Sequence, residues 1–248
     1  MKLRDKTTME REANIRIYQS AYQYLEQIKP EGIILENYFY GDDRDYHSLE
    51  EVFIRFIMSA QNYQRMPNVI AFDKRKKEIE EILQGNDIQK ITEMSAEELY
   101  ICFRQRFNVT TQDSKRNSWY KWSCSIIDSA KFVNAFKDAS EFDEFVKRFD
   151  YNALSRIALP LLIQSRVRGI GFALACDLLK ELGYTNYPKP DTHMIDVFHA
   201  LGLCERDPIS AFIAIEQMAD DCKSVDPRIT PYRVDKVFWL ICAGYYYN

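Results

Sequence analysis

Glycine is scarce in this sequence, with only 8 among 248 residues, which is about 3% against a usual ~7%. Barrels, sandwiches and nucleotide-binding α/β folds need many tight turns, and glycine makes such turns without strain. Long helices need few glycines and place most of them at their C-termini. The composition therefore predicts an all-α protein.

Metal-ligand spacing and long apolar runs are also missing. The apolar stretch 157–163 is too short to cross a bilayer and contains Pro160. The N-terminal residues lack the apolar region of a secretory signal. We therefore expect a soluble, cytoplasmic or otherwise intracellular protein with no membrane partner and with reduced, mostly buried thiols. The cysteines, none in a C-x-x-C pair, are Cys102, Cys124, Cys176, Cys204, Cys222 and Cys242.

The chain carries no excess of positive charge, since 33 Lys and Arg stand against 37 Asp and Glu, a net charge of −4. A local basic face is nevertheless sufficient for nucleic-acid binding. Segment 104–122 contains five cations and the single acidic residue Asp113. Lys115 and Arg116 in this segment precede Trp119 and Trp122. These aromatic residues fit either a helical core or base stacking, and both interpretations stay open.

Polar capping residues and prolines mark about ten predicted helices. Ser48 can cap a helix over 49–59, and Ser140 can cap a helix that ends at 149. Ser95 with Glu98 forms a capping box. Asp207 and Thr230 each precede a proline, as in an N-cap followed by proline at the first helical position. Apolar periodicity predicts further helices over 10–29, 67–83, 115–133, 140–149, 157–163 and 172–182.

Two of the eight glycines, Gly169 and Gly171, lie two residues apart, directly before a predicted helix. This placement lets backbone N–H groups approach an anion, and the helix dipole favours that anion. Arg166 and Arg168 flank the turn and could reach neighbouring phosphates. The alternative is a tight corner between two helices that uses glycine only for its backbone angles.

A second polar motif follows this turn, after two prolines. Pro188 and Pro190 stiffen the approach to Asp191, which occupies the predicted N-cap of the next helix. A carboxylate at an N-cap is kept ionised by unpaired N–H groups and by the helix dipole. A capping role alone is the alternative interpretation of Asp191.

The order of these motifs resembles the helix-hairpin-helix DNA glycosylases of the endonuclease III superfamily. The resemblance is carried by Gly169-Ile170-Gly171, then a helix, then Asp191-Thr192-His193. Upstream, Ser59-Ala60-Gln61 ends an apolar helix as the family's S-A-Q does. Lys115-Arg116 stands where relatives often begin a helix with a K-A pair, which is a weak match. The resemblance covers roughly residues 45 to 203.

The resemblance implies an all-α, two-lobed helix-hairpin-helix fold with the active-site cleft between the lobes. One lobe is then 49–190, with the hairpin at about 157–183. The other lobe joins 1–48 to 191–248.

The resemblance also implies the activity. A glycosylase of this family extrudes a damaged or modified base from double-stranded DNA and breaks its N-glycosidic bond, which initiates base excision. Asp191 is then the catalytic carboxylate. Residues implied to contact DNA are Gly169, Gly171, Arg166, Arg168, Phe172, Gln61, Asn62, Lys115 and Arg116.

Three further residues are implied near the base pocket or the catalytic carboxylate. Tyr63 joins Gln61 and Asn62 in filling the gap left by the extruded base. Thr192 and His193 follow Asp191, and we favour a satisfied structural role for His193. The aromatic residues of segment 237–247 either sandwich the extruded base or belong to the core, so the base itself stays open.

The sequence departs from the family pattern in three places. Ala173 stands where strand-cutting relatives carry a lysine nucleophile, which favours a monofunctional enzyme. A bifunctional glycosylase and lyase that uses another lysine, such as Lys189, is the alternative. The C-terminal cysteines are too few for the family's iron–sulfur cluster, so we expect no cofactor and no metal. Arg168 replaces a common proline and adds a cation.

Two other functions stay open. The first is a non-catalytic helix-hairpin-helix module that only binds DNA, and the second is an all-α scaffold for protein partners. We favour the enzyme because a pure binding module has no need of Asp191 behind a stiff loop. We expect a monomer, located with the DNA in a nucleoid or nucleus.

Overall fold

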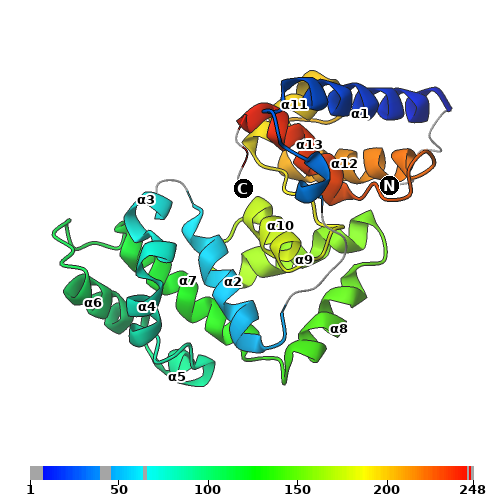
Figure 1. Ribbon diagram of the computed structural model, residues 1–248. Coiled ribbons are helices and arrows are strands. Elements are labelled where there is room, and N and C mark those ends of the chain that lie inside the picture. Colours follow the sequence, from blue (N-terminus) through cyan, green and yellow to red (C-terminus); the bar gives the residue numbers. More distant parts are fainter. Residues whose placement is uncertain (1–7, 40–45, 64–65, 245, 247–248) are drawn as a thin grey trace. The chain divides into compact units, whose positions relative to one another are not determined.

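The computed structural model describes residues 8–39, 46–63, 66–244 and 246. Within these ranges the chain forms helices joined by short loops, and no strand occurs (Figure 1). The predicted all-α class is confirmed. None of the helices in the described ranges combines the length and the apolar content needed to cross a membrane.

Contacts between residues divide the chain into two compact units. We call Met1–Arg44 with Gly183–Asn248 the terminal unit, and Asp45–Leu182 the central unit. The lobes expected from the sequence have their limits at residues 48/49 and 190/191, whereas the limits of these units lie at 44/45 and 182/183.

The terminal unit is a bundle in which α1 packs on α12 and α13, and α11 packs on the same two helices. Its core contains Tyr18, Met194, Phe198 and Phe238, all buried. Its helices are α1 (Thr8–Ile28), the short 3-10 helix η1 (Leu35–Tyr38), α11 (Thr192–Ala200), α12 (Pro208–Cys222) and α13 (Pro231–Ala243).

The central unit is built around α7 (Ser118–Val133), which contacts α2, α3, α5, α6 and α9. Trp122 is fully buried, and its Nε1 donates to the carbonyl oxygen of Ile57 at 2.8 Å. Trp119 is also buried. Both tryptophans are therefore core residues rather than base-stacking platforms. The other helices are α2 (Leu49–Gln61), α3 (Met66–Ile70), α4 (Phe72–Ile82), α5 (Ile88–Glu93), α6 (Ala96–Arg106), α8 (Ala139–Phe149), α9 (Ala153–Arg166) and α10 (Phe172–Glu181).

Most predicted helix starts are confirmed, because an N-cap depends on neighbours in sequence. Ser48, Asp207 and Thr230 each accept a hydrogen bond from the first turn that follows. Ser95 forms the predicted capping box with Glu98.

Three predicted boundaries are wrong. The cap of α8 is Asp138 rather than Ser140, and Asn117 caps α7 two residues after its predicted start. The helix expected over 67–83 is two helices, because Ala71 adopts a left-handed conformation with φ 48°.

Candidate nucleic-acid interface and candidate active site

The turn between α9 and α10 requires glycine at only one of its two glycine positions. Gly169 has φ +84°, and a Cβ there would lie 2.5 Å from the Oγ of Ser125. Gly171 has φ −83°, which any residue can adopt, and a Cβ there would meet no atom within 4 Å. The backbone angle and the contact with Ser125 thus require glycine at position 169, whereas Gly171 borders open space that a side chain could occupy.

Helix α10 begins without a side-chain cap, because Gly171 is its N-cap residue. The flanking helices differ, since Asn152 caps α9 and Asp191 caps α11. The first intrahelical bond at the start of α10 runs from Ala175 N–H to the Gly171 carbonyl. Backbone donors at such a helix start can bind an anion.

Phe172 cannot contact DNA through its ring in this structure, because only 6% of the residue is exposed. It is an apolar residue at the first position of an amphipathic helix, so it packs inward. The predicted contact is therefore wrong for its side chain.

The two arginines of the turn differ in their partners. The side chain of Arg166 is exposed and forms no hydrogen bond or ion pair with another described residue. The Arg168 side chain is 63% exposed, yet its Nε and Nη2 donate to the two carboxylate oxygens of Asp128 at 2.6 and 2.9 Å. The hydrogen bonds and charge of Asp128 raise the pKa of Arg168. Arg166 is thus the unengaged cation of this turn, and Arg168 is occupied.

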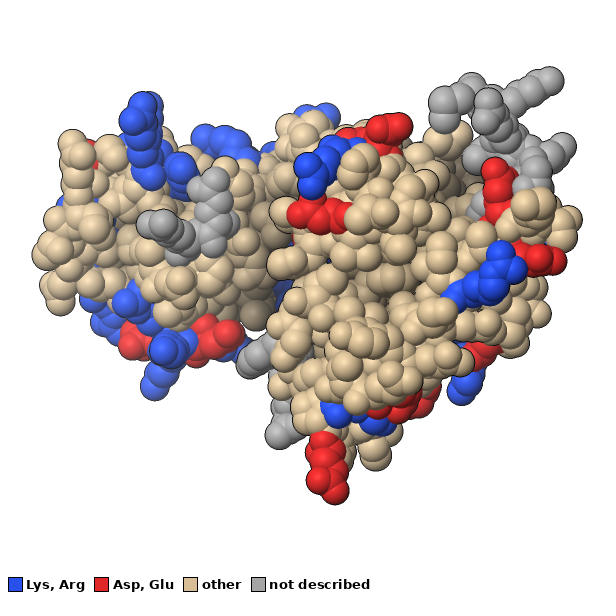
Figure 2. All heavy atoms as spheres, turned by 90° about the horizontal axis from the view of Figure 1, so that it is seen from above, with Lys and Arg blue, Asp and Glu red and all other residues tan. Residues whose placement is uncertain are grey.

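The basic segment 104–122 likewise separates into paired and unpaired cations. Arg104 donates to Tyr100 and Thr111, and Arg106 pairs with Glu81 at 2.7 Å. The side chains of the exposed residues Lys115, Arg116 and Lys121 form no hydrogen bond or ion pair with another described residue. On the face drawn in Figure 2, basic side chains stand at separate places with acidic ones among them.

A cavity of about 340 Å³ in the central unit brings several predicted residues together. Of the predicted DNA contacts, Lys115, Arg168 and Gly169 line it, together with Tyr63. Lys121 lies over the Tyr63 ring, with Nζ 5.9 Å from its centroid. The nine lining residues include three cations and no carboxylate: Tyr63, Met66, Lys115, Tyr120, Lys121, Cys124, Ser125, Arg168 and Gly169.

The basic segment predicted from the sequence includes Tyr120 and Lys121 of the α7 wall of this cavity, but Cys124 and Ser125 of the same wall were not predicted. Tyr120 donates to Glu97 at 2.7 Å, and this bond raises the pKa of Tyr120 to about 12, so its phenol is neutral at pH 7. Burial raises the pKa of the Cys124 thiol. Lys121, Cys124 and Ser125 recur at helical spacing, which is the signal that could have found this wall.

Gln61 does not project from the end of α2 as the resemblance implies. The residue is 7% exposed, and its Oε1 accepts from the backbone N–H of Phe72 at 3.2 Å. The N-cap residue of α4 is Ala71, whose methyl side chain cannot accept a hydrogen bond. The Gln61 amide therefore provides the acceptor for the first N–H of this helix. Asn62 and Tyr63, the next two residues, are exposed.

Asp191 lies in the terminal unit and caps α11, as predicted. Its Oδ1 accepts from the N–H groups of His193 and Met194 at 3.0 and 3.2 Å. Its Oδ2 accepts no hydrogen bond from another described residue. The approach is held by the N–H of Lys189, which donates to Asp235 at 3.0 Å. The result is a half-buried carboxylate with one engaged oxygen and one open oxygen.

The surroundings of Asp191 include one correction. His193 and Thr192 are exposed, and the His193 ring forms no hydrogen bond with another described residue, so a satisfied structural histidine is wrong. Partial burial, and then the charge of Asp191, raise the pKa of the Cys242 thiol on α13. No cluster of three or more His, Cys, Asp or Glu side chains suited to a metal ion occurs in the described ranges.

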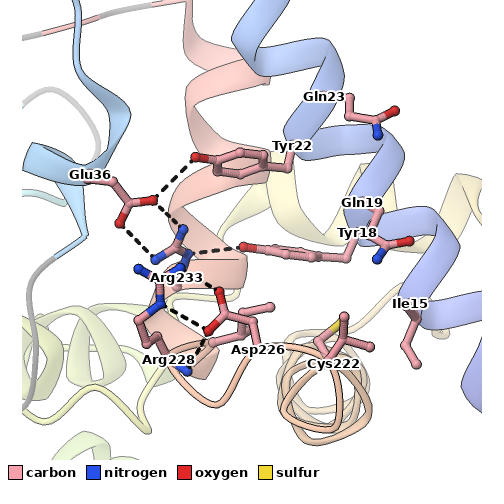
Figure 3. A pocket seen from close by; sticks show the side chains of 12 residues that line it. Ile15, Tyr18, Gln19, Tyr22, Gln23, Glu36, Cys222, Asp226, Arg228 and Arg233 are labelled. Atoms are coloured by element: carbon pink, nitrogen blue, oxygen red, sulfur yellow. Dashed lines mark hydrogen bonds and ion pairs between the residues drawn. The ribbon is translucent and has the colours of Figure 1, made fainter.

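Two cavities of the terminal unit have carboxylates in their linings. One, of about 370 Å³, contains Arg233 bound to Glu36 and Arg228 bound to Asp226 (Figure 3). The other, of about 720 Å³, has Glu10 and Glu205 among its lining residues and no lysine or arginine. Paired or acidic linings do not favour a polyanion, unlike the lining of the central-unit cavity.

Comparison with known proteins gave one likeness. No family model matches the sequence, and no curated protein matches it. The backbone is similar to a solved structure described as Methanocaldococcus jannaschii 8-oxoguanine glycosylase/lyase in complex with 15mer DNA containing 8-oxoguanine. The TM-score is 0.49 and the sequences are 13% identical, over 94% of this chain and 92% of that chain.

Proposed function

We propose that this protein is a monofunctional DNA glycosylase that acts on a damaged or modified base in double-stranded DNA. The observation that carries the proposal is the arrangement at Asp191, a carboxylate held at a helix N-terminus with one oxygen open. The hairpin at Gly169 and Gly171, with its uncapped α10, supports DNA binding by the same chain.

The DNA is bound by backbone donors and unpaired cations of the central unit. The N-terminus of α10 receives a phosphate, and Arg166 contacts a neighbouring one. Lys115, Arg116 and Lys121 add sequence-independent attraction that weakens as salt rises. This local charge permits binding despite the net charge of −4.

Base release requires the nucleotide to rotate out of the duplex, at a cost of a few kcal/mol. We assign the filling of the resulting gap to Asn62 and Tyr63, because Gln61 is engaged with α4. The cavity beside Tyr63 offers an uncharged phenol and cations to the DNA next to the gap.

Asp191 then acts on the sugar. As the bond between C1′ and the base nitrogen breaks, positive charge develops on the sugar, and the ionised carboxylate stabilises it. Water attacks C1′ and gives its proton to Asp191, while the base leaves with the bonding electron pair and takes up a proton. The products are the free base and an abasic site.

No covalent intermediate forms in this scheme, because Ala173 has no amine that could attack the sugar. A lyase that uses another lysine, with Lys189 as the first candidate, is the second possibility. Borohydride treatment during turnover distinguishes the two, since only an imine between lysine and sugar is reduced to a stable protein–DNA adduct. The proposal predicts no adduct, and it includes no metal or other cofactor.

The first prediction concerns Asp191→Asn. Asparagine caps a helix as well as aspartate does, so α11 is expected to persist and DNA binding to stay within about twofold, an affinity change below about 0.5 kcal/mol. Base release is expected to fall by about 10³-fold or more, because the charge that stabilises the sugar is lost. The assay uses duplexes that each carry one lesion or modified base, with and without alkali.

Asp196→Asn is the matched control, because Asp196 is an exposed aspartate on the same helix and pairs with Arg206. This control should keep full activity. Strand breakage only after alkali, lost in Asp191→Asn, identifies the substrate and supports the proposal. Equal loss of binding and release would count against the role given to Asp191.

A non-catalytic DNA-binding module is the second candidate function, favoured by the same uncapped hairpin. It predicts salt-sensitive duplex binding with no base release from any lesion duplex. A protein scaffold predicts no duplex binding at low salt. We place the monomeric protein with the DNA inside the cell.

A further inference from the structure

Helix α7 forms four hydrogen bonds with Arg168, a residue of the hairpin turn. Asp128 accepts three hydrogen bonds from Arg168: from the backbone N at 3.1 Å, from Nε at 2.6 Å and from Nη2 at 2.9 Å. Ser125, one turn earlier on α7, donates to the carbonyl oxygen of Arg168 at 2.6 Å. Both backbone polar groups of Arg168 and its guanidinium are therefore held by one helix.

This contact controls the main chain as well as a side chain. Arg168 directly precedes Gly169, the residue with φ +84°. Val167 and Ile170 on either side are buried, so the turn cannot shift outward without exposing them. Ser125 Oγ also closes the space where a Cβ of residue 169 would lie. Charge-assisted, bidentate hydrogen bonds of this kind are stronger and more directional than hydrogen bonds between neutral groups.

We propose that Asp128, supported by Ser125, is a positioning residue for DNA binding. It holds the turn so that the backbone donors at Gly169 and at the start of α10 meet a DNA phosphate. The inference rests on the proposed function, because it names what orients the hairpin of that interface. Asp128 itself does not touch the DNA in this scheme.

Electrostatic repulsion and positioning of the turn predict opposite effects of neutralising Asp128 on DNA affinity. A carboxylate beside a phosphate-binding surface repels DNA, so its neutralisation should strengthen binding. Positioning predicts the reverse, since Asp128→Asn would loosen the turn and weaken binding although one negative charge is gone.

The experiment measures the dissociation constant of the full chain for a fluorescently labelled duplex at several salt concentrations. We expect Asp128→Asn to weaken binding about tenfold, which corresponds to about 1.4 kcal/mol. Ser125→Ala, which changes no charge, should weaken it about threefold, roughly half that free energy. Asp143→Asn is the control, because Asp143 pairs with Lys147 on α8 of the same unit at 2.6 Å. Its binding should be unchanged or slightly tighter.

Several outcomes would overturn the proposal. Unchanged binding by Asp128→Asn, with or without a lower melting temperature, would make the pair a stabilising contact only. Tighter binding, with a salt dependence steeper by about 0.9 in slope, would mean that Asp128 merely neutralises Arg168.

Further comparisons distinguish a folding defect of the variant from a failure of the inference or of the proposed function. If Asp128→Asn fails to fold, Ser125→Ala decides, and its unchanged affinity would overturn the proposal. If the wild type binds no duplex, the proposed function fails together with this inference. If the wild type binds duplex and both variants bind it equally well, the inference fails but the proposed function stands.

Discussion

At the scale of single residues, the two glycines of the hairpin have different physical reasons. Gly169 is needed by its backbone angle and by Ser125, whereas Gly171 is an N-cap in extended conformation with open space around it. We predict that Gly171→Ser stabilises the protein by a few tenths of a kcal/mol, because serine caps α10. The same change should weaken duplex binding several-fold, because the hydroxyl competes with the phosphate for the N–H groups. Thermal unfolding and fluorescence anisotropy measure the two effects, and tighter or equal binding would remove this helix start from the interface. Gly169→Ala should instead destabilise the fold by at least about 1 kcal/mol.

At the scale of elements, the end of α2 separates a structural residue from a functional one. Gln61 holds the start of α4 through Phe72, whereas Asn62 is exposed. Gln61→Ala should therefore lower the free energy of unfolding by about 1–3 kcal/mol, because a buried donor loses its acceptor. Asn62→Ala should leave stability within about 0.5 kcal/mol and reduce base release, because Asn62 is assigned to fill the gap. Urea unfolding beside the base-release assay checks both variants. An unstable Asn62→Ala, or a stable Gln61→Ala that has lost activity, would reverse the two assignments.

At the scale of the whole molecule, a buried arginine joins the two ends of the chain within the terminal unit. Arg233 on α13 binds Glu36 with two hydrogen bonds and contacts the hydroxyl of Tyr18 on α1 at 3.3 Å (Figure 3). Burial raises the pKa of Tyr18 from 10.0 to about 12. The unfolded chain thus releases this proton first as pH rises, so stability is full below pH 10 and falls as pH approaches 12. The loss is roughly 2–3 kcal/mol, and Tyr18→Phe should show a smaller loss over the same window in alkaline urea unfolding. An identical pH dependence for the variant would contradict this account.

What the sequence determined by itself was local. The scarcity of glycine and the capping residues predicted helices and most of their starts, because an N-cap depends on residues two or three positions away. Ser95 with Glu98, Asp191 and Thr230 are such cases. The hairpin and the carboxylate were recognisable as motifs for the same reason.

The partner of each polar side chain, in contrast, depends on how the helices pack. Asp128 and Arg168 are 40 residues apart, and Gln61 and Phe72 lie on different helices. Nothing in the local pattern shows that Arg168 is occupied while Arg166 is not. The inward direction of Phe172 also depends on packing. Pairing across helices is set by how their faces meet, and a single sequence does not state that geometry.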